Sequence, residues 1–542
     1  MHPTTDAPTE QVLAARGHGG YRQYRIPALA VSTAGTVLAA YDGRPNLDDL
    51  PNTIDLLLRR SHDDGRTWGP QQVIRTGAGL AGYGDPSLLV DRDTGRLFCF
   101  HAAGTHAGFF EAVEGLEPTD DVQHVDLSTS DDDGATWTHR RLTGMLKRPG
   151  ITGIFAAAGT GIQLDAGPHA GRLLQQMVIL LHGTIRAASA YSDDHGDTWM
   201  LGEPAPGEGN ENKTACLPDG TVLLNSRAPG TRLGALSTDG GHSYTALEPI
   251  PTLPDPGDNG SILRLRTTPG GGSVLLATNN RDTALRRNTV ASTSHDDGTT
   301  WSPVLTLCPG SSAYSTAAVL ADGAVGVFFE RDGYSELVFT RIEATALTDE
   351  ALATAAETFT DDDGVALAMV PRSITPGRPE HWRSVGESHT IGANAGEWGV
   401  HTWKEIGQGY TGDAQVLGTR EAQIANYGEP APGLKAGDIL AFTGRFTNTG
   451  SATVTAILSG TFDGNDGGSL APLFPPATLA PGEHVLYFTP VYTVSEEDIA
   501  AGIAVVHWSV SAGGATWAQR ARVDTGTGRF HVRDLPGAAA GA

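Results

Sequence analysis

The segment Ser61–Trp68 reads SHDDGRTW, and closely related phrases follow it along the chain. The shared pattern is S-x-D-x-G-x-T-W, and successive copies begin about 45 to 70 residues apart. The other copies are Ser130–Trp137 (SDDDGATW), Ser192–Trp199 (SDDHGDTW), Ser294–Trp301 (SHDDGTTW) and a degraded one, Ser237–Tyr244 (STDGGHSY). A period in this range indicates an array of similar structural units, such as propeller blades or the coils of a solenoid.

Each copy is predicted to form a hairpin turn between two strands. The first copy follows the apolar run Ile54–Leu58 and precedes Val73 and Ile74. Ser and Asp side chains hydrogen-bond to their own backbone in turns, and Gly accepts a positive φ. Thr and Trp suit the start of the next strand. We expect the Trp to pack between neighbouring units, and the Asp residues, whose spacing differs from that of a calcium loop, to bind no metal.

The composition favours an all-β protein with more than one domain. The chain has 542 residues, of which 70 are Gly and 18% are charged, as expected for many short strands and turns. The net charge is −25, from 37 basic and 62 acidic residues, which argues against binding to nucleic acid or to an anionic membrane. In such an acidic chain, any local cluster of Arg stands out.

The cysteines and the chain start exclude some classes of protein. Cys99, Cys216 and Cys308 are odd in number and show no C-x-x-C spacing, so buried thiols are expected rather than a disulfide framework or a zinc site. The start of the chain has no apolar signal-peptide core, and no segment approaches the roughly 20 apolar residues of a membrane span. We therefore expect a soluble protein, from which a leader has been removed if it is secreted.

The repeats suggest how the chain divides. All copies lie in residues 1–347, a length that suits six four-stranded blades, with the blade that lacks a copy built from both ends of this region. Residues 348–380 are expected to be a linker with one short helix, 348–358. Residues 381–535 contain strand-like runs such as 438–447 and 503–510, which favour an immunoglobulin-like β-sandwich. Residues 536–542 are expected to be a disordered tail.

Several phrases in the first region are not explained by turns or packing. They are Tyr24–Pro27 (YRIP), Tyr41–Pro45 (YDGRP), Gly84–Ser87 (GDPS), Asn210–Lys213 (NENK), Leu224–Arg227 (LNSR), Leu285–Asn288 (LRRN) and Ala313–Thr316 (AYST). A propeller brings the inner strand ends of all its blades around one axis, so residues that are distant in sequence can meet there. These phrases are the candidates for a functional site.

The repeated phrase is the Asp box, and the chain resembles the six-bladed propellers of sialidases, sortilin-type receptors and some other glycosidases. The seven phrases run in order through nearly all of residues 10–345. With them and the Asp boxes, the chain most resembles bacterial exo-sialidases (neuraminidases), especially the secreted actinobacterial type. The resemblance implies a glycoside hydrolase, located outside the cell, that acts on sialylated glycans or free sialosides. It implies no metal and no organic cofactor.

Three arginines are predicted to bind the carboxylate of the substrate. Arg25, Arg227 and Arg286 fall at the family's positions, and guanidinium groups match carboxylate oxygens in bidentate fashion. Sialic acid carries its carboxylate on the anomeric carbon. Arg286 is preferred for its spacing of 28 residues to Tyr314, and its neighbour Arg287 remains the alternative.

The same carboxylate argues for an uncharged nucleophile. Most retaining glycosidases use a carboxylate nucleophile. Two unit charges about 4 Å apart repel by roughly 4 kcal/mol at an effective dielectric constant of 20. A Tyr avoids this repulsion if a base takes its proton. Tyr314 and Glu211 match the family's nucleophile and base.

The remaining candidate residues also follow from the resemblance. The general acid falls at Asp49, with Asp48 as the alternative, on a polar loop after Gly43–Pro45. Arg44 either contacts the substrate or orients this loop. Asp85 matches a position near the N-acetyl or C4 side of the sugar, and Glu330 matches a residue that supports one Arg, here Arg25.

Some questions stay open from the sequence. Residues 150–156, Phe109–Phe110 and residues 111–121 differ from close relatives, which leaves the preferred sialic acid and linkage undecided. A trans-sialidase, or an intramolecular enzyme that forms an anhydro-sugar, would use the same residues. A non-catalytic glycan-binding propeller would have no reason to keep Tyr314, Glu211 and Asp49 with three Arg. The second unit is expected to be a structural or weakly glycan-binding accessory, whose tryptophans are Trp382, Trp398, Trp403, Trp508 and Trp517.

Overall fold

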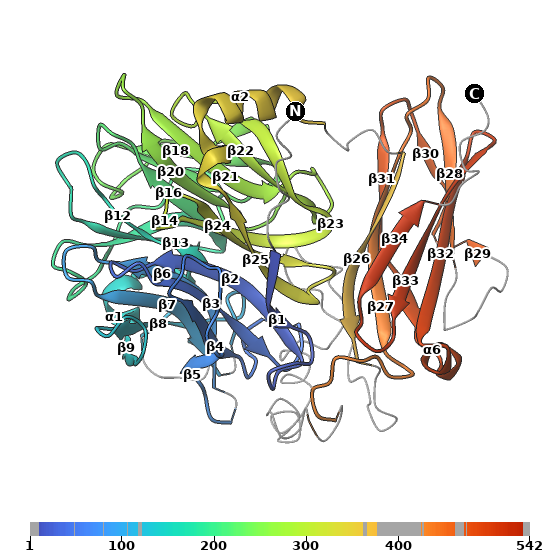
Figure 1. Cartoon of the computed structure of the whole chain (residues 1–542), viewed down its shortest axis with the longest axis horizontal. Coiled ribbons are helices and arrows are strands. Elements are labelled where there is room, and N and C mark those ends of the chain that lie inside the picture. Colours follow the sequence, from blue (N-terminus) through green and yellow to red (C-terminus); the bar gives the residue numbers. More distant parts are fainter. Residues whose placement is uncertain are drawn as a thin grey trace.

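The computed structural model of the chain is built almost entirely of strands and turns, which confirms the all-β prediction. It describes residues 10–47, 49–79, 81–105, 107–116, 122–360, 366–376, 424, 428–460, 471–472 and 474–534. Figure 1 shows two bodies, one formed by β1 to β25 and the other by β26 to β34. Asp48, Trp382, Trp398, Trp403 and the tail 536–542 lie outside the described residues. Within the described residues, no helix has the length and apolar character needed to cross a membrane.

Four sheets of the first unit each contain a run of four antiparallel strands, and two of them have one additional short strand. The first contains β2 (Gln23–Val31), β3 (Val37–Arg44), β4 (Asp55–Ser61) and β5 (Gln72–Arg75). The second contains β6 (Gly82–Val90), β7 (Leu97–Gly104), β8 (His124–Ser130) and β9 (Thr138–Arg141), with β11 (Gly159–Thr160) parallel to β6. The third contains β10 (Ile151–Ala156), β13 (Leu173–Leu181), β14 (Thr184–Ser192) and β15 (Met200–Leu201), with β12 (Ile162–Gln163) beside β13. The fourth contains β16 (Asn212–Cys216), β17 (Val222–Ser226), β18 (Pro229–Ser237) and β19 (Glu248–Pro256).

A seven-stranded sheet completes the first unit and joins its two ends. Its members are β20 (Ser261–Thr267), β21 (Ser273–Asn280), β22 (Arg287–Ser294), β23 (Ser302–Val319), β24 (Val325–Arg331), β25 (Glu336–Ile342) and β1 (Glu10–Ala15). The first part of β23 pairs with β22 and its second part with β24, so the sheet consists of two four-stranded halves that share β23. β1 pairs antiparallel with β25, which confirms that the two ends of this region build one sheet.

The repeated phrases form hairpin turns, as predicted. They lie between β4 and β5, β8 and β9, β14 and β15, β18 and β19, and β22 and β23. In the first copy, Ser61 Oγ accepts a hydrogen bond from the Gly65 N–H at 2.9 Å. Asp63 accepts from the Thr67 N–H at 2.8 Å and from the Thr67 hydroxyl at 2.6 Å. The other four copies repeat these bonds, so each turn satisfies its own polar groups.

The Trp of the third copy packs between two sheets. Trp199, which is 2% exposed, precedes β15 and lies edge-on against Phe98 and Phe100 of β7 in the preceding sheet. The ring centroids are 6.0 and 4.8 Å from that of Trp199. Trp301 is likewise buried, in a cluster with residues of β16 to β21. The predicted role of these residues as packing wedges is therefore confirmed at these two copies.

Helices are few, and two lie near the end of the first unit. α1 (Thr143–Leu146) follows β9, and the 3₁₀ helix η1 (Ala344–Leu347) precedes α2 (Asp349–Thr358). Thr348 caps α2 by accepting a hydrogen bond from the Ala351 N–H. The predicted linker thus contains α2, and it also contains β26 (Leu367–Thr375), which pairs with the second unit. The three cysteines are free and buried, as expected.

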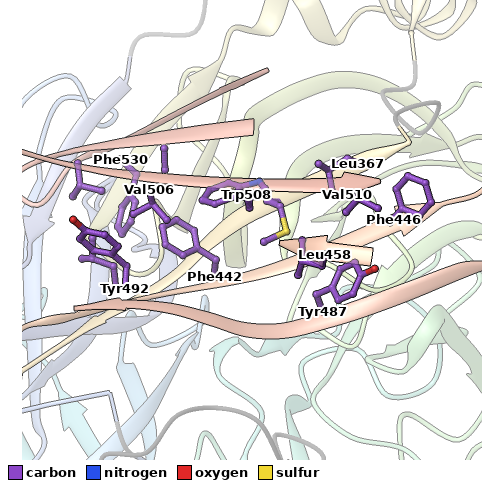
Figure 2. Packing of buried hydrophobic residues seen from close by; sticks show 14 of the residues in the cluster. Leu367, Phe442, Phe446, Leu458, Tyr487, Tyr492, Val506, Trp508, Val510 and Phe530 are labelled. Carbon is purple, nitrogen blue, oxygen red and sulfur yellow. The ribbon is translucent and has the colours of Figure 1, made fainter. Parts of the chain in front are cut away.

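The second unit consists of two sheets around one core. One sheet contains β26, β27 (Ile439–Thr447) and β31 (His484–Thr493). The other contains β28 (Val454–Gly460), β29 (Ala471–Pro472), β30 (Ala477–Leu479), β32 (Ile503–Ala512), β33 (Ala515–Asp524) and β34 (Phe530–Asp534), and α6 (Glu496–Ala501) precedes β32. Figure 2 shows Phe442, Trp508 and Phe530 in the core between them. Trp508 is 1% exposed and lies in this core, and the partly buried Trp517 packs against it at Phe446.

The two units are joined by polar contacts that involve β26 and β27. Ser311 Oγ donates to the Pro371 carbonyl at 2.7 Å, and Gln23 Nε2 donates to the Ile374 carbonyl at 3.2 Å. Arg445 of β27 forms a buried ion pair with Asp282 at 2.9 Å. In Figure 1, β26 lies on the side of the second unit that faces the first. β26 is therefore the strand of the second unit that comes nearest to β23.

The burial of Trp199 gives a test of the wedge. We expect Trp199→Ala to lower the free energy of unfolding by about 3 to 5 kcal/mol, because it empties a closed site between two sheets. Trp137→Ala is the matched control: it removes the same residue of the same phrase from a half-buried position and should cost clearly less. Urea denaturation followed by tryptophan fluorescence and circular dichroism measures both. Equal losses in the two variants would contradict the proposed wedge.

Candidate active site

Tyr314, Glu211 and Arg227 form a closed triangle of hydrogen bonds. The Tyr314 hydroxyl donates to Glu211 Oε2 at 2.6 Å. Arg227 Nη1 donates to the Tyr314 hydroxyl oxygen at 2.7 Å and also to Glu211 Oε2. Glu211 is 3% exposed and Tyr314 is 7% exposed. A phenol is thus held against a carboxylate that can accept its proton, beside a cation that can stabilise the resulting phenolate.

The local fold explains why Glu211 and Arg227 meet. β16 and β17 form an antiparallel hairpin in which Asn212 pairs with Ser226. Glu211 and Arg227 are the next residues outward on each strand, and the Arg227 N–H donates to the Glu211 carbonyl at 2.8 Å. Their separation of 16 residues in sequence therefore becomes a direct cross-strand pair.

Three arginines surround the ring of Tyr314. The guanidinium carbons of Arg25, Arg227 and Arg286 lie 5.1, 5.8 and 5.5 Å from the ring centroid. They come from different sheets, because Arg25 lies in β2, Arg227 follows β17 and Arg286 precedes β22. The structure therefore brings together the three arginines that the sequence singled out, next to the predicted nucleophile. Such a cluster can bind an anion with several guanidinium groups at once.

Of the two adjacent arginines, Arg286 and not Arg287 belongs to this cluster. Arg286 Nη1 donates to the Tyr334 hydroxyl oxygen at 2.7 Å, and its Nε lies 3.7 Å from Asp258. Arg287 donates instead to Asp282 at 2.6 Å, the carboxylate that also pairs with Arg445 of the second unit. Successive residues at the start of a strand point to opposite faces, which separates the two side chains.

Glu330 of β24 ties three parts of the site together. It is 0% exposed and accepts from Arg25 Nε at 3.1 Å. It also accepts from the Ile26 N–H at 2.8 Å and from the Tyr314 N–H at 3.1 Å. Although burial acts against the charge of Arg25, the Glu330 carboxylate raises the pKa of Arg25 well above its usual range. Ile26 has a φ of 60°, an uncommon backbone conformation for a β-branched residue, and this contact helps to hold it.

Asp49 lies at the edge of the arginine cluster and remains accessible. Its side chain is 60% exposed, and Arg44 Nη1 donates to Asp49 Oδ1 at 2.7 Å. The same oxygen lies 3.8 Å from Arg25 Nη1. Partial removal from water acts to raise the pKa of Asp49, but Arg44 and Arg25 outweigh it and hold that pKa below its usual value. Asp49 is therefore ionised when no ligand is bound.

Arg44 is fully buried, so it orients the loop rather than facing a ligand. It is 0% exposed and forms a second ion pair with Asp42 at 2.7 Å. Asp42 lies two residues earlier on β3, on the same face of the strand. Of the two roles considered for Arg44, its contacts favour the positioning of Asp49.

Asp85 lies close to Asp42 on the neighbouring strand β6. Its N–H donates to Asp42 Oδ2 at 3.5 Å, and its φ is 61°. Burial raises the pKa of Asp85 well above its usual value, and the carboxylates of Asp42 and Asp49 add to this effect. Burial also raises the pKa of Asp42 to about 6, against the effect of Arg44. Asp85 can therefore present a protonated carboxyl group, which donates as well as accepts.

Tyr314 is uncharged until a proton is taken from it. Burial raises the pKa of Tyr314 well above its usual value, and the Glu211 carboxylate adds to this effect, while Arg227, Arg286 and Arg25 oppose it. A nucleophile with a high pKa needs a base within hydrogen-bond reach, and Glu211 occupies that place. The three cations then stabilise the charge that develops on the oxygen.

Sequence reasoning did not find every residue of the site. Tyr334, in the turn between β24 and β25, touches both Arg286 and Arg25, and Asp258 pairs with Arg286. Lys213, two residues after Glu211 in the chain, donates to Asn259 at 2.8 Å, and burial lowers its pKa to about 7. Asp42 could have been found, because it lies two residues before Arg44 on a strand. Tyr334 and Asp258 carry no comparable signal, since the arginines that they contact are distant from them in sequence.

One group of potential metal ligands occurs among the described residues, and it lies outside this cluster. Asp91, Asp93 and His195 come together at the end of β6 that is opposite to Asp85. Their oxygens already accept hydrogen bonds from protein groups: Gln163 Nε2 donates to both aspartates, and Thr94 donates to Asp91. This group is well explained as a hydrogen-bonded turn.

The central position of Glu330 leads to a prediction about stability. Glu330→Gln leaves the buried guanidinium of Arg25 without its main counter-charge, so we expect the free energy of unfolding to fall by about 3 kcal/mol. Glu343→Gln is the control, because Glu343 pairs with Arg341 from a position that is 61% exposed, and such pairs contribute less than about 1 kcal/mol. Chemical denaturation of both variants measures the difference. Comparable stabilities would contradict the role of Glu330 in holding the site.

Comparisons with known proteins show which family the chain resembles. Residues 35–327 match the model of the BNR repeat-like domain family. The chain is 47% identical over 335 residues to a sialidase of Micromonospora viridifaciens, an alignment that covers 59% of this chain and 52% of that protein. The chain thus spans about half the length of this relative.

Two solved structures extend the likeness to the fold. A Hadza microbial sialidase has a TM-score of 0.58 and 28% identity, covering 62% of this chain and 69% of its own. The sialidase of Trypanosoma rangeli, solved with the inhibitor DANA, has a TM-score of 0.54 and only 14% identity, but covers 99% of this chain and 91% of its own. That likeness concerns the fold alone and extends over both units. The family match covers more than half of the chain, which therefore belongs to the BNR repeat-like domain family and is similar within it to bacterial sialidases.

Proposed function

We propose that the protein is a retaining exo-α-sialidase, which removes terminal sialic acid from glycans through a covalent sialyl-tyrosine intermediate. The observation that carries this proposal is the contact between the Tyr314 hydroxyl and Glu211 inside a cluster of three arginines. The similarity to the Micromonospora viridifaciens sialidase supports the same substrate class.

The arginine cluster favours a substrate whose carboxylate lies next to the reacting carbon. Arg25, Arg227 and Arg286 all lie within 6 Å of the Tyr314 ring, so an anion that they bind is held beside the Tyr314 oxygen. In sialic acid the carboxylate and the glycosidic oxygen share the anomeric carbon. A carboxylate nucleophile in this place would repel the bound anion, and a neutral phenol does not.

In the first step, Tyr314 Oη attacks the anomeric carbon while Glu211 accepts its proton. The bond from the anomeric carbon to the glycosidic oxygen breaks, and Asp49 donates a proton to the departing oxygen. Arg227 contacts both Tyr314 and Glu211, so it can stabilise the phenolate character of the oxygen as the proton moves. In the second step, Asp49 takes a proton from water, which attacks the same carbon. Tyr314 leaves and regains its proton from Glu211, and two inversions give net retention.

Substrate binding explains how Asp49 can act as an acid. In the free protein, Arg44 and Arg25 keep the pKa of Asp49 low. A bound carboxylate neutralises part of the charge of Arg25, removes water from the site and so raises the pKa of Asp49. Asp49 is therefore protonated, and able to act as an acid, when a substrate occupies the arginine cluster.

The same proposal covers the architecture. The four separate sheets and the two halves of the seven-stranded sheet would be the six blades of a propeller, with an immunoglobulin-like sandwich formed by β26 to β34.

Hydrolysis, transfer to a second sugar and release of an anhydro-sugar share the first step and differ in their products. Product analysis by NMR with an aryl α-sialoside therefore separates these three reactions.

Loss of the Tyr314 hydroxyl tests the nucleophile. We expect Tyr314→Phe to reduce kcat on an aryl α-sialoside by at least about a thousandfold, since covalent catalysis at this oxygen is removed while the ring stays packed. Tyr24→Phe is the control, because Tyr24 is a buried tyrosine of the same region whose hydroxyl donates to the His18 carbonyl and takes no part in the hydrogen bonds that join Tyr314, Glu211 and Arg227. Turnover of Tyr314→Phe near that of the wild type would contradict the assignment.

The role of Asp49 is tested by varying the leaving group and the pH. Because the acid must be protonated and its pKa is lowered in the free protein, kcat/KM on an alkyl sialoside should fall as the pH rises through the acidic range. We expect Asp49→Asn to lower kcat/KM on an alkyl sialoside by about a hundredfold or more, and far less on a nitrophenyl sialoside, whose leaving group needs no proton. A loss that is equal for both leaving groups would assign Asp49 a structural role instead.

A further inference from the structure

Tyr334 links two of the three arginines and has no assigned role. Its hydroxyl oxygen accepts from Arg286 Nη1 at 2.7 Å, and the guanidinium carbon of Arg25 lies 4.4 Å from its ring centroid. The residue is 7% exposed. Because it contacts both guanidinium groups, the position of Tyr334 determines how far apart they lie and how they are oriented.

The turn that carries Tyr334 has an uncommon backbone. Asp332, Gly333 and Tyr334 have φ angles of 52, 60 and 63°, three consecutive residues in the left-handed region. A non-Gly residue in this region costs of order 1 kcal/mol, so surrounding contacts must hold it there. The contacts within the first unit are Ser311 Oγ, which accepts from the Gly333 N–H at 3.0 Å, and the Ser311 carbonyl, which accepts from the Asp332 N–H at 3.0 Å.

The second unit provides the other side of this turn. Ser311 Oγ donates in turn to the Pro371 carbonyl of β26 at 2.7 Å. Gly333 lies so close to β26 that a Cβ atom there would be 3.1 Å from the Arg372 carbonyl carbon. A side chain at position 333 would therefore require the turn or the strand to shift by a few tenths of an ångström. β26 therefore packs directly against this turn.

Arg372 reaches the arginine cluster from this strand. The pairing of β26 with β27 shifts register between Pro371 and Ser373, so Arg372 lies at a bulge, where a side chain can be turned out of the regular pattern. It lines a cavity of about 10 Å³ together with Arg286, Tyr334 and Thr443. A hollow of this size holds about one water molecule, so Arg372 packs closely beside Arg286 and Tyr334.

The charges at this point act on one another. Burial lowers the pKa of Arg372 to about 10, with Arg286 and Arg25 acting in the same direction and Tyr334 against them. Burial alone would raise the pKa of Tyr334, but Arg286, Arg372 and Arg25 outweigh it and lower that pKa. The side chain of Tyr334 is thus acted on by cations of both units, Arg286 and Arg25 from the first and Arg372 from the second.

We propose that β26 of the second unit completes the carboxylate-binding site, with Arg372 as a positioning residue that holds Tyr334 between Arg25 and Arg286. The inference rests on the proposed function, since it assigns the three arginines to the carboxylate of a sialoside. It makes the second unit a part of the active site instead of a separate accessory.

The test separates binding of the carboxylate from chemistry. The variants are Arg372→Met, which keeps the apolar stem and removes the charge, Arg372→Lys, which restores a charge, and Tyr334→Phe, which removes the bond to Arg286. For Arg372→Met and Tyr334→Phe we expect KM for an aryl α-sialoside, and Kd for the unsaturated dehydro analogue of sialic acid, to rise by about tenfold or more. The value of kcat should change by less than about threefold, because Tyr314, Glu211 and Asp49 are untouched. Arg372→Lys should recover part of the affinity.

Two controls make the result specific. Arg529→Gln removes another arginine that joins the units, through Glu336 at 2.9 Å, but it lies outside the cluster and should leave KM unchanged. The methyl ester of the dehydro analogue, which lacks the charge of the carboxylate, should bind wild type and variants alike. Unchanged KM and Kd in Arg372→Met and Tyr334→Phe would overturn the inference, as would an equal loss of affinity for the ester. If Arg372→Met does not fold, Arg372→Lys and Tyr334→Phe decide the question by the same measurements. Wild-type protein that binds no sialoside would refute the proposed function itself, a result distinct from both.

Discussion

The buried carboxylate of Glu330 is the contact on which the rest of the site depends. It binds the Arg25 side chain and the N–H groups of Ile26 and Tyr314, so one side chain of β24 sets the positions of β2 and β23. A buried carboxylate of this kind is stable only when it is paired and fully hydrogen-bonded. Here the cost of its burial is offset by three donors, and the same donors place the predicted nucleophile beside the first arginine.

Around this contact, charges of opposite sign alternate. Arg227 lies against Glu211, Arg286 near Asp258, and Arg44 between Asp42 and Asp49. Each guanidinium retains its charge because a carboxylate lies close by, and each carboxylate is held in one orientation by the fork of an arginine. Only Asp49 of these carboxylates is largely exposed, as suits a group that exchanges protons with substrate and water. The neighbouring carboxylates therefore allow several arginines to lie close together with fixed side-chain orientations, in a chain whose net charge is −25.

Much of the fold and part of the site could be predicted from the sequence. The hairpin turns at the repeated phrases follow from local chemistry, because Ser, Asp, Gly and Thr bond within eight residues of one another. The cross-strand pair of Glu211 and Arg227 lies in one hairpin, which makes it accessible to sequence patterns. Local sequence alone could not decide between Arg286 and Arg287, because the choice depends on which face at the start of β22 points to Tyr314. Tyr334 and Arg372 could not be found in this way, since their contacts join parts of the chain that are distant in sequence and, for Arg372, belong to different units.

By itself, the sequence determined the all-β class, the turn chemistry of the repeats and the residue types that can bind an anion and activate a phenol. These properties depend on neighbours along the chain and on side-chain chemistry, and both can be read directly from the residues. Only the tertiary structure decided that Tyr314 lies among the three arginines, that Arg44 is buried behind Asp49, and that β26 lies against the turn of Tyr334. The physical reason is that these contacts arise from the packing of sheets and units against one another, where a shift of one residue in register moves a side chain to the opposite face.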